Sequence, residues 1–251
     1  MAALSGIPAA TAPRLPGSRY DHAFFLAMAV LLALTMVVGF AKTYFLAGVF
    51  RAKLPGVLIH VHGVVFTLWF AVLLAQSALA TLHRIDLHRK LGIAGMAIAS
   101  LMVPLGILSA AEFLRRIASQ RLVMLVAIMP VAELGIFAVL AAAAFYYRRT
   151  PAIHKRLILL ATVGLMGAAV GRMEFLPSWQ FHMAAVVRLF WGYTYILIFV
   201  LVAYDLWSTR RLNRATVWGS FFIIAVQQVF LFIWTTPPWA AFVHWMQSWG
   251  I

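Results

Sequence analysis

Eight histidines stand in this chain of 251 residues, and six of them fall near the ends of long apolar segments. Histidine is the commonest metal ligand in proteins, and histidines on facing helices also hold haem b as axial ligands. The six divide into two sets, one for each end of the apolar segments. The first set is His60, His62 and His182, and the second is His83, His88 and His154.

These two sets predict two cofactor sites. His62 with His182 would hold haem b at one end, and His83 or His88 with His154 would do so at the other. A metal ion is the alternative, and its ligands would come from His60, His62, His182 and Glu133. The chain has no HxxxH or HExxH pair. Three alternatives therefore remain: the protein binds haem b, it binds a metal ion, or it binds no cofactor.

Charged residues inside the apolar segments form a second candidate site. Each costs about 2.5–3.5 kcal/mol at the centre of a bilayer, so each needs a partner or a function. Glu133 needs a cation, and Arg172 and Arg188 are available. The polar site expected from this pattern is Glu133, Arg172, Glu174, Arg188, Gln76 and Trp69. The alternative is a structural ion pair that locks the helices together.

Gln76 and Trp69 belong to this set because of their spacing. His62, Trp69, Gln76 and His83 follow one another at intervals of seven. A step of seven drifts by only about 20° on a helix, so the four residues lie along one slowly winding stripe. The stripe is either a polar track or a packing seam.

The composition explains why the elements that carry these residues must be membrane helices. Hydrophobic residues make up 65% of the chain and charged residues only 10%, and the mean hydropathy is +0.96. Soluble proteins average roughly 45–50% apolar and 25% charged residues, so a soluble fold is excluded. With no cysteine, disulfides, iron–sulfur clusters and thiol catalysis are excluded as well.

Seven apolar stretches are each long enough to cross about 30 Å of hydrocarbon as a helix. Their approximate spans are 23–48, 56–82, 91–113, 122–147, 156–176, 181–207 and 216–236. The predicted fold class is therefore all-α, an integral membrane bundle of seven transmembrane helices. We expect a flexible tail over 1–20, the bundle over 21–236 and a Trp-rich interfacial segment over 237–251.

The basic residues predict the orientation of the bundle. The net charge is +14, from 20 Lys and Arg against 6 Asp and Glu. Twelve of these cations lie in the tail and the three connections on its side, and six lie on the other side. The N-terminus is therefore expected in the cytoplasm and the C-terminus outside, in a bacterial inner membrane. The expected partners are the bilayer and anionic lipid head groups on the cytoplasmic face, not nucleic acid. A membrane-protein partner or a homo-oligomer stays open.

Three segments, HxHGxxFxxW, LHRxLG and HKRL, resemble a family of bacterial multi-pass membrane proteins of unknown function. The resemblance covers the first five apolar segments. It implies recurrent motif positions at His60, His62, Trp69, Gln76, His88, Glu133, His154 and Arg172. Because the family's role is unknown, it implies a class of protein but no reaction and no cofactor.

Three functions remain open at this point, and no enzymatic reaction is assigned. The leading hypothesis is a haem- or metal-binding redox or respiratory-assembly factor, based on the six histidines. The second is a small transporter or sensor with its ligand or proton at Glu133, Arg172 and Arg188. The third is a membrane scaffold without a ligand.

Overall fold

The computed structural model describes residues 20–52, 56–173 and 183–249, and within 183–190 it describes the course of the helix only. All regular structure in these residues is helical. The helices are α1 (Asp21–Phe40) with its π-helical continuation (Ala41–Phe45), α2 (Val57–Thr81), α3 (Ile85–Arg115), α4 (Gln120–Val126), α5 (Ile128–Tyr146), α6 (Pro151–Val163), α7 (Gly167–Val170), α8 (Met183–Thr209), α9 (Arg214–Ile233) and α10 (Pro237–Gln247). Seven stretches are long and apolar enough to cross a membrane, which confirms the predicted class of fold.

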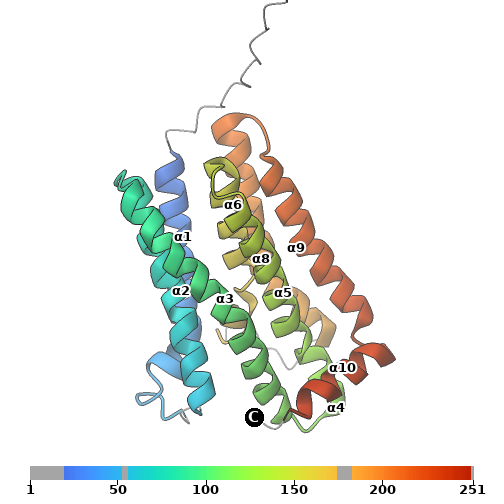
Figure 1. Ribbon diagram of the computed structural model, residues 1–251. Coiled ribbons are helices and arrows are strands. Elements are labelled where there is room, and N and C mark those ends of the chain that lie inside the picture. Colours follow the sequence, from blue (N-terminus) through green and yellow to red (C-terminus); the bar gives the residue numbers. More distant parts are fainter. Residues whose placement is uncertain (1–19, 53–55, 174–182, 250–251) are drawn as a thin grey trace, which may run out of the picture.

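The helices form one elongated bundle (Figure 1). α1, α2 and α3 lie on one side and α5, α6, α8 and α9 on the other, and α3 crosses toward α5. We call the end that holds the start of α1 and the α2–α3, α5–α6 and α8–α9 connections the upper end, as in Figure 1. The opposite, lower end holds α4 and α10. A core of large side chains that includes Trp69, Phe137, Leu160 and Ile223 fills the space between the helices.

Two predicted spans are interrupted helices in the structure. The fourth is divided into α4 and α5 at Ala127, three residues before Pro130. Proline has no N–H to donate to the preceding turn, which weakens the helix there. The fifth is divided into α6 and α7 by a turn over 164–166. Pro104, by contrast, lies within an uninterrupted α3.

Glycines allow close contacts between neighbouring helices. A Cβ atom on Gly164 would lie 2.6 Å from Cγ2 of Ile136 on α5, and one on Gly39 of α1 would collide with the backbone of Ala169 on α7. The α6–α7 turn therefore packs closely against α5, and α7 packs closely against α1, as small residues allow in membrane bundles.

The C-terminal segment contains a helix. α10 starts at Pro237, a favourable first helical position because a proline there loses no hydrogen bond. Trp239, Val243 and Met246 are buried, and the indole N–H of Trp239 donates to the carbonyl of Met124 at 2.8 Å. Trp245 is exposed. The interfacial location of this segment and the orientation of the bundle stay predictions.

Candidate functional site

Two histidines at the upper end are held by hydrogen bonds of the same kind. Nδ1 of His88, near the start of α3, lies 3.2 Å from the carbonyl oxygen of Gln76. Nδ1 of His154, near the start of α6, lies 2.8 Å from the carbonyl oxygen of Ala144. A carbonyl only accepts, so Nδ1 carries the hydrogen and Nε2 carries the free lone pair. Metal-bound and haem-bound histidines have this arrangement.

His88 and His154 are half-buried and close enough for their charges to act on one another. His83 packs against α1 instead. It adopts a left-handed backbone conformation (φ 58°) in the α2–α3 turn. Its ring packs on His22 of α1 with a centroid separation of 5.4 Å. Of the two histidines that the sequence offers as a partner for His154, His83 packs on α1, whereas His88 is half-buried near the start of α3.

Glu133 lies inside the lower half of the bundle. Its residue is only 3% exposed, and its carboxyl group packs so closely on Gly167 that any side chain there would collide with it. Among the described residues, no group hydrogen-bonds to its Oε1 atom. A buried polar atom without a partner is rare and points to a bound water or ligand.

Arg172 follows α7 and lies near Glu133 without forming an ion pair with it in the described structure. Its Nη1 donates to the carbonyl of Ala168 at 2.6 Å, and its guanidinium carbon lies 4.5 Å from the ring centroid of Phe40. Glu133 and Arg172 both lie against the Gly167–Ala168 backbone. We call these two residues, together with His62 of α2, the lower polar site.

His62 belongs to this site through α2. Its ring stacks on Phe66 with a centroid separation of 4.0 Å. Its Nδ1 is buried, and no described group hydrogen-bonds to it. Glu133 and Arg172, two of the predicted polar residues, therefore meet at one backbone segment, and His62 forms no hydrogen bond or ion pair with either among the described residues. Glu174 and His182 lie outside the described residues, as does the side chain of Arg188, so their part in the site stays a prediction.

The other predicted residues lie apart from both sites or have local partners. Nδ1 of His60 lies 3.3 Å from the hydroxyl of Tyr44. The indole of Trp69 donates to Thr162 at 3.2 Å. The amide of Gln76 lies against Gly92. Within the described parts of the chain, no three His, Asp or Glu side chains gather as metal ligands. The metal set with His182 stays a prediction.

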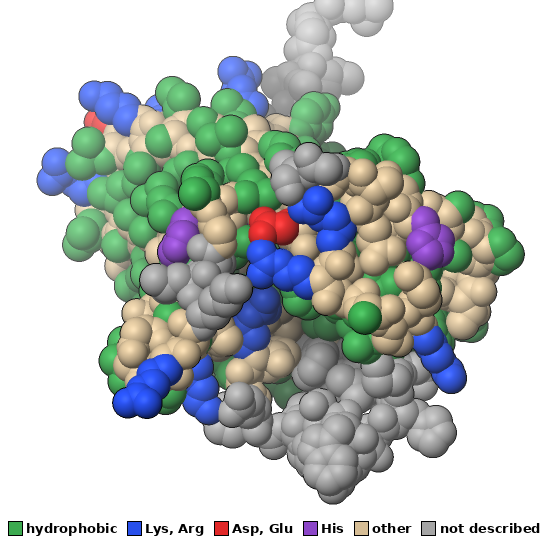
Figure 2. All heavy atoms as spheres, turned by 90° about the horizontal axis from the view of Figure 1, so that it is seen from below, with side chains coloured by type: hydrophobic (Ala, Val, Ile, Leu, Met, Phe, Trp, Pro, Cys, Tyr) green, Lys and Arg blue, Asp and Glu red, His purple; other side chains and the backbone are tan. Residues whose placement is uncertain are grey.

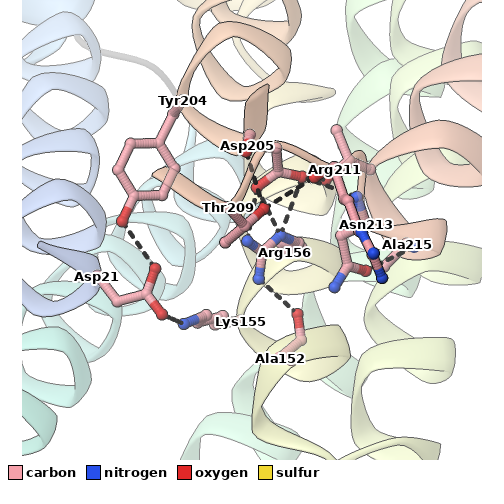
Figure 3. A network of polar contacts seen from close by, with 11 residues as sticks. Asp21, Ala152, Lys155, Arg156, Tyr204, Asp205, Thr209, Arg211, Asn213 and Ala215 are labelled. Carbon is pink, nitrogen blue, oxygen red and sulfur yellow. Dashed lines mark hydrogen bonds and ion pairs between the residues drawn. The ribbon is translucent and has the colours of Figure 1, made fainter. Parts of the chain in front are cut away.

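A buried ion pair that the sequence reasoning missed lies at the upper end (Figure 3). Asp205 of α8 is fully buried. Arg156 of α6 donates to it from Nε at 3.0 Å and from Nη2 at 2.5 Å. The hydroxyl of Thr216 at 2.6 Å and the backbone N–H of Asn213 at 3.2 Å complete the shell of donors. The network joins α6, α8 and the start of α9.

A second ion pair lies beside the first in Figure 3. Lys155 pairs with Asp21 at the start of α1, and the hydroxyl of Tyr204 donates to the same carboxylate at 2.7 Å. Lys155 and Arg156 are therefore already paired. Both residues thus have partners within the chain.

No protein-family model, curated protein or solved structure matches the chain. The functional argument rests on the seven apolar helices and on the geometry of the two sites.

Proposed function

We propose that this protein is a multi-pass membrane protein that binds haem b, or a metal ion, between His88 and His154 at the upper end of the bundle. Its role would be that of a redox or respiratory-assembly factor in a bacterial inner membrane. When bound, the iron or metal would supply the ability to take up and release an electron.

One observation carries this proposal. Both histidines donate Nδ1–H to a helix carbonyl, so both offer Nε2 as the coordinating nitrogen. The carbonyls fix the tautomer and the orientation of each ring before any cofactor arrives. The two rings are also held on different helices, α3 and α6, and these two residues would hold the group.

The charges around the pair are compatible with a haem. Arginine and lysine side chains at the upper end are exposed, and they would face the carboxylates of a haem or lipid phosphates. They include Arg84, Arg89, Lys90, Arg148 and Arg149.

The test is the haem and metal content of the purified protein and of its single variants. His88→Ala and His154→Ala should each remove the bound haem or metal. The control is His60→Ala, because His60 is also a histidine near a helix start but hydrogen-bonds to Tyr44. Equal content in all four proteins would contradict the proposal, as would a chain that never carries haem or metal.

A second candidate function is that of a small transporter or sensor that uses the lower polar site. The buried Oε1 of Glu133, which has no partner among the described residues, favours it. An ionisable residue within a membrane span most often marks a ligand or ion pathway. Glu133→Gln should then abolish the response to the ligand or to protons.

A further inference from the structure

We propose that His22 and His83 bind one zinc ion at the upper end of the bundle, with water in the remaining coordination positions. The proposal goes beyond the haem or metal site at His88 and His154, because it uses neither of those residues. It also gives His83, which the sequence offers as a haem ligand, a different partner.

Two imidazole rings from distant parts of the chain meet at this place. His22 lies in the first turn of α1, and His83 lies in the turn between α2 and α3. Their ring centroids are 5.4 Å apart, and the ring planes are inclined by 53°. Zn–N bonds are about 2.0–2.1 Å long, so two imidazoles on one tetrahedral ion have their ring centroids about 5 Å apart. The two rings therefore need little movement to share a zinc ion.

The ring nitrogens distinguish this pair from an ordinary aromatic contact, which has a similar separation. His22 and His83 are both exposed, and neither ring forms a hydrogen bond within the described residues. By contrast, Nδ1 of His60, His88 and His154 lies within hydrogen-bond distance of another group of the chain. Imidazole nitrogen is the commonest metal ligand in proteins, and here two rings offer theirs side by side.

The backbone at His83 adds a second observation. Its φ of 58° is left-handed, a conformation that glycine adopts without strain and most side chains disfavour. Backbone strain of this kind is concentrated at binding and functional sites. A glycine at this position would leave His22 without a second imidazole, whereas the histidine places its ring against α1.

The start of α1 shows what the ion would do. Asp21 is buried and pairs with Lys155 of α6, while the next residue, His22, is exposed and contacts His83. A zinc ion would thus join α1 to the α2–α3 turn, beside the ion pair that joins it to α6. Asp86, three residues after His83, is exposed and adds negative charge near the ion.

Among the described residues, the lower end has no comparable pair. Figure 2 shows this end, where the visible histidine side chains lie well apart from one another. His60 contacts the hydroxyl of Tyr44, and His62 stacks on Phe66. His244 is exposed on α10, away from other histidines. It therefore serves as the matched control for a single exposed histidine.

The number of protein ligands sets the character of the site. Structural zinc sites have four protein ligands, and this site has two. We therefore expect reversible binding that a chelator removes. Magnesium prefers oxygen ligands, so it should not compete for two imidazoles.

The experiment is calorimetric titration of the full-length protein with zinc chloride, in nanodiscs of phosphatidylcholine and after removal of metal with EDTA. The purification tag must contain no histidine, and the heat of empty discs is subtracted. One zinc ion per chain should bind at His22 and His83, and it should persist in His88→Ala. X-ray absorption of that zinc-loaded variant should show two histidine nitrogens at about 2.0–2.1 Å from the ion.

The variants test the two ligands separately. His22→Gln and His83→Asn should each lose this zinc ion, and His244→Gln should keep it. Asparagine is chosen at position 83 because it tolerates the left-handed conformation. The proposal is overturned if the wild-type protein binds no zinc, if either ligand variant keeps the ion, or if folded His88→Ala loses it. A protein without haem or metal at His88 and His154 would contradict the proposed function and leave this site intact.

Discussion

Arg156 and Asp205 meet inside the bundle although 49 residues separate them in the chain. Their side chains are 4% and 0% exposed. Together with Thr216 they connect α6, α8 and α9 at one point. Two charges buried this deeply are stable only as a pair, because either one alone would face an apolar interior.

The first prediction concerns this pair. Asp205→Asn should cost about 3–5 kcal/mol of stability, because it leaves the guanidinium of Arg156 buried without its counter-ion. The double variant Arg156→Met/Asp205→Leu should recover most of that loss. Thermal unfolding in detergent measures both. The control is Arg116→Gln at the exposed pair with Glu112, which should cost no more than about 1 kcal/mol. Equal losses in the two single variants would refute the structural role of the buried pair.

The second prediction concerns Tyr204, whose hydroxyl donates to Asp21. Tyr204→Phe keeps the ring stacked on Phe24 and removes the hydrogen bond to Asp21. A hydrogen bond to a charged group contributes about 1.5–3 kcal/mol, so we expect a loss in that range. Tyr146→Phe, at a residue that is 77% exposed, should leave the melting temperature unchanged. If Tyr204→Phe leaves the melting temperature unchanged, Lys155 alone is sufficient to stabilise the buried carboxylate of Asp21.

The third prediction compares two glycines. Gly164→Ala would place a methyl group 2.6 Å from Ile136, and overpacking of this kind costs about 1–3 kcal/mol. Gly135 lies one residue before Ile136, and nothing within 4 Å would meet its added Cβ. Gly135→Ala should instead stabilise α5 by about 0.5–1 kcal/mol. If Gly164→Ala does not lower the melting temperature, the close packing of the α6–α7 turn on α5 is wrong.

The fourth prediction tests orientation, and the absence of native cysteine makes it direct. Ala118→Cys labels the α3–α4 connection at the lower end, and Leu212→Cys labels the α8–α9 connection at the upper end. A membrane-impermeant maleimide should react with Ala118→Cys in intact cells and with Leu212→Cys only after permeabilisation. The reverse pattern would invert the predicted topology.

The sequence predicts the helices well because the apolar runs themselves set their length. The second predicted span, 56–82, differs by one residue at each end from α2, Val57–Thr81. The interruptions at Ala127 and over 164–166 depend on local backbone geometry and on neighbouring helices. A hydropathy pattern reports neither backbone geometry nor helix neighbours, so the sequence predicts continuous helices for the fourth and fifth spans. The helix α10 was also not expected, since eleven residues are too few to read as a span.

The candidate sites are partly predictable. The rule that an ionisable residue inside a span needs a partner or a function identifies Glu133 and Arg172, and the structure places both against the Gly167–Ala168 backbone. The same rule applies to Asp205, which stands between apolar residues near the end of α8, and the sequence reasoning overlooked it. The partners of Arg156 and Lys155 could not be predicted, because helix neighbours are set by packing.

The central claim is that His88 and His154 hold a redox cofactor. Its most direct test is the dithionite-reduced minus air-oxidised absorption spectrum of the protein purified from bacterial membranes. The account predicts a Soret band and α band of bis-histidine haem b, both lost in His88→Ala and in His154→Ala. A flat difference spectrum with no metal by elemental analysis would contradict it.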